Sequence, residues 1–137
     1  MSTEVASGAV VYQERDGQPA YLLLQSATSD FWGFPKGHVE GQETLVETAK
    51  REIKEETQLD VTIDTGFKTA TAYALPNGNR KEVTLFVSKV PSGVAVTRQK
   101  VEISAVGWFD YATARERLTY DNLKQMLDEA NAYILKK

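Results

Sequence analysis

A single helical segment, residues 44–57, separates two groups of β-rich segments in this chain of 137 residues. The segment contains no glycine or proline, and Leu45, Ala49 and Ile53 recur at the spacing of one helical face. One helix between groups of strands does not give the regular βαβ alternation of a dinucleotide-binding fold. Neither G-x-G-x-x-G nor G-x-x-x-x-G-K-[S/T] occurs. The order instead predicts an α/β layered domain with helices packed on a mixed sheet.

Turn signals divide the rest of the chain into short elements. Before the helix we predict strands at 6–13 and 20–25, with a longer loop at 14–19 between them, and a glycine-punctuated loop at 26–41. After the helix we predict strands at 59–75 (interrupted near 64–66), at 82–90 and within 101–109, with a turn at 76–79. Two helices follow, one at 111–118 and one that is capped by Asp121 and runs to about 135. We expect two hairpins, one on each side of the first helix.

The composition excludes several classes of function. Apolar residues make up 42% of the chain and charged residues 26%, which predicts one globular domain over residues 1–137. The net charge of −3 argues against a broad basic surface for nucleic acid, but leaves room for a local patch that binds a small anion. There is no cysteine, so disulfides, thiolate metal sites and cysteine nucleophiles are excluded. The only histidine, His38, excludes a multi-histidine zinc site within one chain.

Targeting signals are weak in this sequence. Glu4 stands where a signal peptide would carry basic residues, and the longest apolar runs are far below the roughly 20 residues that span a bilayer. We therefore expect a soluble, cytoplasmic and monomeric protein without a membrane partner.

Three carboxylates gather at one edge of the helical segment. Glu52, Glu55 and Glu56 stand at i, i+3 and i+4, within an arc of about 100° that borders the apolar stripe. Their mutual repulsion and the negative end of the helix dipole both disfavour this arrangement, by a few tenths of a kcal/mol for each pair. A divalent cation would offset the cost. Ligation by oxygen alone suits Mg2+ or Mn2+, and such an ion commonly takes phosphate as its remaining partner.

The same acidic edge has a simpler interpretation. Carboxylates on a helix are commonly solvated and paired with neighbouring basic residues, and Lys50, Arg51 and Lys54 are available here. The glycine-punctuated loop before the helix and the adjacent Arg51 favour the metal site.

Residues 37–59 resemble the signature of the Nudix hydrolases, G-x5-E-x7-R-E-U-x-E-E-x-G-U, where U is a bulky aliphatic residue. Eight of the nine fixed positions match, namely Gly37, Glu43, Arg51, Glu52, Ile53, Glu55, Glu56 and Leu59. The departure is Gln58, where the family has a glycine that would end the helix in a left-handed conformation.

The resemblance implies a Nudix-type α/β/α sandwich with a central mixed β-sheet. It also implies hydrolysis of a nucleoside diphosphate linked to another group, with Mg2+ or Mn2+ as cofactor. The implied metal site consists of Glu52, Glu55, Glu56 and Gly37. Either Glu55 or Glu56 would help to deprotonate the attacking water, and Arg51 would orient a glutamate such as Glu43.

Residues 32–40 look like the W-x-x-P-K-G-H-V-E run of the asymmetric diadenosine tetraphosphate hydrolases, which release ATP and AMP. This resemblance implies that Lys36 and His38 contact the phosphate chain and that Trp32 lines the substrate site. Tyr73 would stack on adenine, and Glu102, six residues before a tryptophan, would add a carboxylate at the metals.

Two positions depart from that subgroup. The subgroup has E-P-G-E where residues 40–43 are E-G-Q-E. A second base-stacking aromatic has no sure match, since Leu123 falls near its place and Tyr120 is the neighbouring substitute. Both departures bear on nucleotide preference more than on the chemistry.

Other functions stay open at this point. The Trp32–Gly37 run also resembles hydrolases that remove pyrophosphate from RNA 5′ ends, although the negative net charge disfavours RNA as a partner. Nucleoside triphosphates and diphosphoinositol phosphates are further possible substrates. A nucleotide-binding Nudix module without activity is disfavoured, because such modules usually lose signature carboxylates. Individual residues also have structural alternatives: packing for Tyr73, hydrogen bonding for His38, and simple solvation for Lys36 and Glu102.

Overall fold

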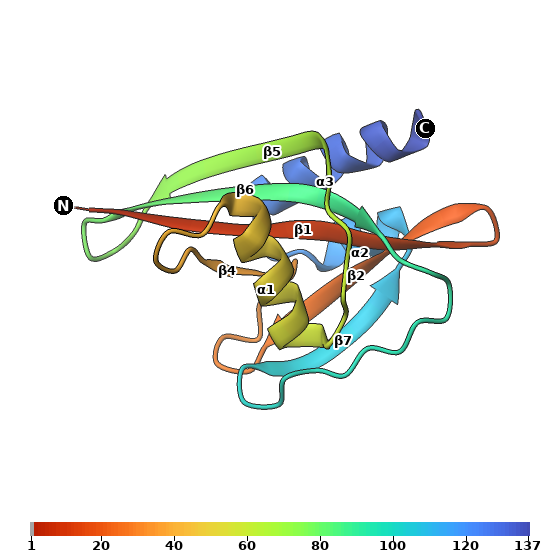
Figure 1. The fold of residues 1–137 in the computed structure, drawn as a ribbon, viewed down its shortest axis with the longest axis horizontal. Coiled ribbons are helices and arrows are strands. Elements are labelled where there is room, and N and C mark those ends of the chain that lie inside the picture. Colours follow the sequence, from red (N-terminus) through yellow and green to blue (C-terminus); the bar gives the residue numbers. More distant parts are fainter. Residues whose placement is uncertain (1) are drawn as a thin grey trace.

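The computed structural model describes residues 2–137 as one mixed β-sheet with helices on both faces (Figure 1). The strands are β1 (Thr3–Arg15), β2 (Gln18–Ser26), β3 (Trp32–Gly33), β4 (Lys36–His38), β5 (Asp64–Ala74), β6 (Arg80–Lys89) and β7 (Ile103–Phe109). The helices are α1 (Leu45–Thr57), α2 (Tyr111–Arg117) and α3 (Asp121–Leu135). Among the described residues, no helix is both long and apolar enough to cross a membrane.

The alternating side chains of β1 create two separate cores. Ala9 and Val11 face the α1 side, where they pack in one cluster with Ile53 of α1. Val10 and Tyr12 face the opposite side, in a second cluster that contains buried residues of α2 and α3. Figure 1 shows α1 in front of the sheet and α3 behind it. The expected α/β/α sandwich is therefore confirmed.

The pairing of β1 leaves part of one of its edges free for β4, which lies in the segment before α1. On one edge β1 pairs in parallel with β6, and on the other edge it pairs antiparallel with β2 through residues 12–15. Further along that second edge, residues 6–8 pair with β4. This pairing holds Lys36, Gly37 and His38 between β1 and α1, which positions the site described below.

Two predicted loops are shorter than expected. The β1–β2 turn is not a long loop, because pairing continues to Arg15 and Gln18 and leaves only Asp16 and Gly17 outside the ladder. Both residues have positive φ angles, 52° and 79°, as a tight two-residue hairpin turn requires. The segment 26–41 is also not all loop, since it contains β3 and β4, which are too short to give an alternating pattern.

Helix α1, expected over residues 44–57, spans Leu45–Thr57. Thr44 is the N-cap and forms a capping box with Glu47. At the other end Gln58 takes the left-handed conformation with φ of 62°, and its N–H donates to Lys54 O over 2.9 Å. The left-handed conformation expected at residue 58, where the Nudix signature has glycine, is thus confirmed. A non-glycine residue in this conformation costs about 1 kcal/mol.

Two other boundaries were predicted wrongly. Residues 59–63 form no strand, because Leu59 and Val61 are buried in the α1-side core and serve packing rather than pairing. Helix α3 has Tyr120 as its N-cap, and Asp121 is its first helical residue. The negative charge of Asp121 in the first turn still interacts favourably with the helix dipole.

Candidate active site

Arg51 connects the carboxylates of α1 with the loop before it. Its Nε donates to Glu43 Oε2 over 2.6 Å, and its Nη1 donates to Glu52 Oε2 over 2.7 Å and to Glu55 Oε1 over 3.2 Å. Its Nη2 reaches the backbone oxygen of His38 over 2.9 Å. The hydrogen bond from Arg51 is the main reason that the pKa of Glu43 falls to about 2. One guanidinium thus relieves much of the repulsion along this edge.

Glu56 lies on the other side of the cluster and has a different environment. Its Oε1 accepts the backbone N–H of Lys36 over 3.2 Å. Burial and the neighbouring Glu52 carboxylate raise the pKa of Glu56 to about 8. Without a cation this carboxyl therefore keeps a proton at neutral pH. Replacing that proton by a hard divalent ion would relieve both the burial and the repulsion.

Residue 37 must be glycine because the Glu52 carboxylate lies close to its Cα, and not because its backbone angles require glycine. A Cβ at this position would lie 2.0 Å from Glu52 Oε1. The carboxylate of Glu52 therefore packs directly on the Gly37 backbone, with its other oxygen held by Arg51. Any side chain at residue 37 would displace Glu52.

The carboxylates provide the donor type that Mg2+ or Mn2+ prefers, but they are not yet gathered around one point. Within residues 2–137, no three His, Asp or Glu side chains form a ready-made ligand set. Arg51 holds one oxygen each of Glu52 and Glu55 and leaves their remaining oxygens for another partner. The donor chemistry fits the predicted ion, and binding it requires these side chains to reorient.

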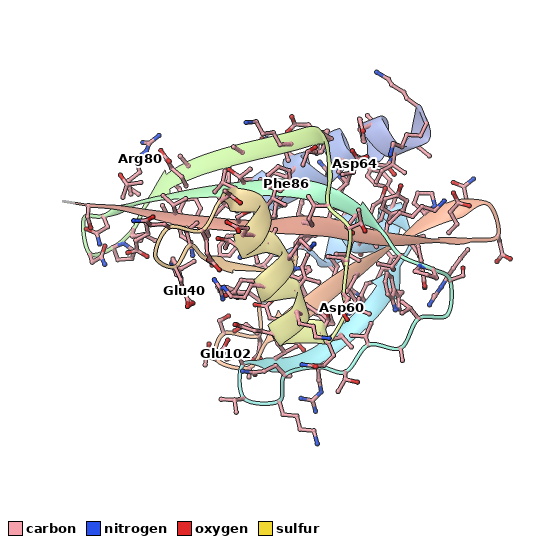
Figure 2. The ribbon with its side chains drawn as sticks, viewed as in Figure 1. Glu40, Asp60, Asp64, Arg80, Phe86 and Glu102 are labelled. Carbon is pink, nitrogen blue, oxygen red and sulfur yellow. The ribbon has the colours of Figure 1, made fainter. Side chains whose placement is uncertain are left out.

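Two adjoining cavities extend from this cluster across the sheet edge. They share four lining residues, which are Lys36, Glu56, Lys81 and Glu102. The smaller cavity, of about 500 Å³, is also lined by Gly37, His38, Glu40, Glu52 and Glu55. The larger cavity, of about 830 Å³, is also lined by Phe31, Trp32, Tyr73 and Tyr120. In Figure 2, Glu40 and Glu102 lie along the same side of α1.

All but one of the sequence-predicted site residues line these two cavities. The exception is Arg51, which lies behind the carboxylates and contacts Glu43, as the resemblance implied for it. Glu102 comes from the loop before β7 and still reaches both cavities. The structure therefore brings together residues that are up to 70 positions apart, from Trp32 to Glu102.

Aromatic side chains line the larger cavity and not the smaller one. Tyr73 on β5 is 38% exposed and Tyr120 is 49% exposed. Phe31 contacts Tyr120 edge-to-face, with ring centroids 5.1 Å apart. Leu123 is buried in the core, so Tyr120 is the residue that offers an aromatic face near this position. Trp32 is less free, because its ring packs edge-on against that of Phe109 at 5.6 Å.

Two lysines, Lys36 and Lys81, line both cavities together with Glu56 and Glu102. Burial lowers the pKa of Lys36, and nearby Lys81 lowers it further. Lys81 was not predicted from the sequence. It sits directly opposite Tyr73 in the β5–β6 ladder, so the register of the hairpin at the Asn77–Gly78 turn was the signal that could have identified it.

His38 is held from two sides. Its ring Nε2 lies 3.3 Å from Glu4 Oε1, and its backbone oxygen accepts from Arg51. Glu4 in turn accepts a hydrogen bond from Asn79 Nδ2 over 3.2 Å. His38 therefore lines the smaller cavity with its ring beside Glu4. Trp108, in contrast, packs against the α1-side core.

Comparison with known proteins agrees with the fold and the cavity. The NUDIX domain family model matches residues 2–130, so the chain belongs to the Nudix family. The crystal structure of a C. elegans Ap4A hydrolase binary complex superposes on this chain with a TM-score of 0.91 at 26% sequence identity. That likeness covers 98% of this chain and 99% of the other.

Two curated relatives differ in how much of their length is matched. The mouse asymmetrical bis(5′-nucleosyl)-tetraphosphatase is 30% identical over 118 residues, which are 83% of this chain and 80% of the relative. The mRNA-decapping enzyme subunit 2 of Saccharomyces cerevisiae is 28% identical over 122 residues. That match takes in 88% of this chain but only 12% of the yeast protein, so the chain is similar to one part of it.

Proposed function

We propose that this protein hydrolyses nucleotide polyphosphates with the help of a divalent cation, and that its substrate is diadenosine tetraphosphate. The observation that carries the proposal is the continuous surface of the two cavities. Aromatic rings line only the larger cavity, and the carboxylates of Glu52 and Glu55 line only the smaller one. The residues that line both are Lys36, Lys81, Glu56 and Glu102. A nucleotide polyphosphate likewise joins phosphates, which bind metal ions and cationic side chains, to a base that can stack.

The larger cavity would take one adenosine. Tyr73 and Tyr120 offer ring faces, and stacking on a nucleobase contributes about 1–3 kcal/mol for each base. Trp32, fixed by Phe109, would form part of the wall behind them. Lys36, Lys81 and His38 would contact the phosphate chain as it runs toward the smaller cavity.

The carboxylates would carry out the chemistry. Glu52, Glu55, Glu56 and Glu102 would hold the ion, with Gly37 beside them. When bound, the ion supplies a Lewis acid for the phosphate oxygens and lowers the pKa of a water. Glu55 or Glu56 would accept the proton of the attacking water as the water oxygen bonds to phosphorus and the bond to the leaving nucleotide breaks.

Arg51 would act through other residues. Its contacts with Glu43 and with the backbone of His38 hold the loop against α1, and its contact with Glu52 fixes one carboxylate oxygen. A misplacement of about 1 Å in such a group can cost about 100-fold in rate, so this bracing matters for catalysis.

Product analysis tests the proposal directly. Diadenosine tetraphosphate is incubated with the protein and Mg2+, and the nucleotides are separated over time. We expect ATP and AMP in equal amounts and no reaction in the presence of EDTA. Two molecules of ADP, or turnover that persists in EDTA, would show that the proposed reaction is wrong. Binding without turnover in Mn2+ would point instead to a nucleotide-binding module.

A second candidate substrate is a polyphosphate at the 5′ end of RNA. Similarity to the yeast decapping enzyme supports it, whereas the net charge of −3 offers little attraction for an RNA backbone. Competition between diadenosine tetraphosphate and 5′-triphosphate RNA separates the two. We expect the dinucleotide to be consumed first.

A further inference from the structure

We propose that Gln99 is a positioning residue that sets Glu102 against the end of α1 that carries Glu56. The proposal rests on the function proposed above, in which Glu102 is a metal ligand. Gln99 belongs to neither cavity lining, so it would act only through its neighbours.

Gln99 forms hydrogen bonds to both sides of the metal site. Its backbone N–H donates to the backbone oxygen of Glu56 over 3.1 Å. Its side-chain Oε1 accepts the backbone N–H of Glu102 over 2.6 Å, and its backbone oxygen accepts the N–H of Ile103 over 3.0 Å. One residue therefore links the last turn of α1 to the turn that presents Glu102.

The α1 end of this link is a natural anchor. The last carbonyl groups of a helix have no partner within the helix and need one elsewhere. Gln99 supplies a donor to Glu56, and Thr97 supplies one to Thr57 over 3.1 Å. The incoming loop thus satisfies two carbonyl groups of α1, which fixes it relative to the carboxylates of that helix.

The Glu102 end depends on its backbone for its position. Glu102 is exposed, and within residues 2–137 its carboxylate takes part in no hydrogen bond or ion pair. Its N–H is held by Gln99, and its backbone oxygen accepts from Ala27 over 2.8 Å. Because no other side chain orients the carboxylate, removing the Gln99 acceptor would leave the Glu102 N–H unrestrained and let Glu102 shift, while the bonds from Ala27 to Glu102 O and from Ile103 to Gln99 O remain.

Affinity for Mn2+ alone provides the test, measured by calorimetric titration of the folded protein. Gln99→Met keeps the backbone hydrogen bonds and the side-chain length but lacks the acceptor. Partners that orient a metal ligand typically contribute about 10-fold or more to affinity, so we expect Mn2+ binding about 10-fold weaker. Val101→Met is the matched control, since Val101 lies in the same turn and is 81% exposed. It should bind Mn2+ as the parent does.

A double variant separates positioning from general loosening. If Gln99 acts through Glu102, Gln99→Met should have no further effect on Mn2+ affinity in a Glu102→Gln background. An equal loss in both backgrounds, or binding by Gln99→Met within twofold of the Val101→Met control, would overturn the inference. Unchanged Mn2+ affinity in Glu102→Gln itself would instead refute the metal role of Glu102 in the proposed function. Gln99→Leu, which also lacks the acceptor, serves if Gln99→Met does not fold.

Discussion

Replacing Gly37 by alanine should abolish most activity while leaving the fold nearly intact. The added Cβ would lie 2.0 Å from Glu52 Oε1 and 2.1 Å from the carboxyl carbon of Glu52. Ordinary contacts of a Cβ are about 3.4 Å or longer, so the carboxylate must move by more than about 1 Å. A shift of about 1 Å in a catalytic geometry can cost about 100-fold in rate.

The cost to stability should be small because the displaced group is the flexible end of a side chain. Gly37 does not have a positive φ angle, so alanine introduces no backbone strain. The main loss is the 2.7 Å hydrogen bond between Arg51 and Glu52. Such a bond contributes on the order of 1 kcal/mol to folding, and the substitution should lower thermal stability only slightly.

Gly33→Ala is the matched control, because it adds the same methyl group in the same segment. Its Cβ would meet only Leu123 Cδ1, at an ordinary distance of 3.6 Å. We expect kcat/KM for diadenosine tetraphosphate to fall about 100-fold in Gly37→Ala and less than threefold in Gly33→Ala. Circular dichroism and thermal melting monitor the fold of both. Equal activities in the two variants would refute the role given to the Glu52–Gly37 contact.

Four further predictions concern the same site. Glu56→Gln should lower kcat by 100-fold or more, as loss of a metal ligand or base does, and a fall of only a few-fold in steady-state assays would contradict its role. In EDTA, the raised pKa of the Glu56 carboxyl contributes to the folding free energy below about pH 4.5, its unfolded pKa, and this contribution is lost as the pH rises through about 8. Glu56→Gln should therefore show a smaller fall in melting temperature over this pH range than the parent protein. An unchanged slope of melting temperature against pH would count against the raised pKa of Glu56. Tyr73→Ala should raise KM for diadenosine tetraphosphate about 10-fold through lost stacking but leave inhibition by tripolyphosphate unchanged, and equal effects on both would argue against base stacking. Lys81→Met should lower kcat/KM about 10-fold or more, while Lys89→Met, on the same strand but paired with Glu14, should not; similar losses in both would exclude a specific phosphate contact.

Local signals predicted the elements whose residues carry a repeating pattern. Helix α1 shows its apolar stripe in the sequence, and the expected range of 44–57 differs by one residue from the observed Leu45–Thr57. Strands β3 and β4 span two and three residues, too few to show alternation, and they form because β1 and β2 offer free edges. Buried loop residues such as Leu59 were read as strand, because an apolar run does not reveal whether it packs or pairs.

The candidate site was predicted where residues have a characteristic spacing. Glu52, Glu55 and Glu56 follow helical geometry, so they could be placed on one edge from sequence alone. Lys81 and Gln99 have no such spacing. Their places depend on the register of a hairpin and on a loop that contacts the end of α1, and both are properties of the tertiary structure.

Locating the divalent ion most directly tests the central claim, that the glutamates of α1 form a metal site. A crystal soaked in Mn2+ shows the ion by its anomalous scattering. We expect a peak bounded by the carboxylates of Glu52 and Glu56, with the Gly37 backbone beside it. A well-ordered map with Mn2+ elsewhere, and with Glu52 and Glu56 turned apart around no ion, would contradict the account.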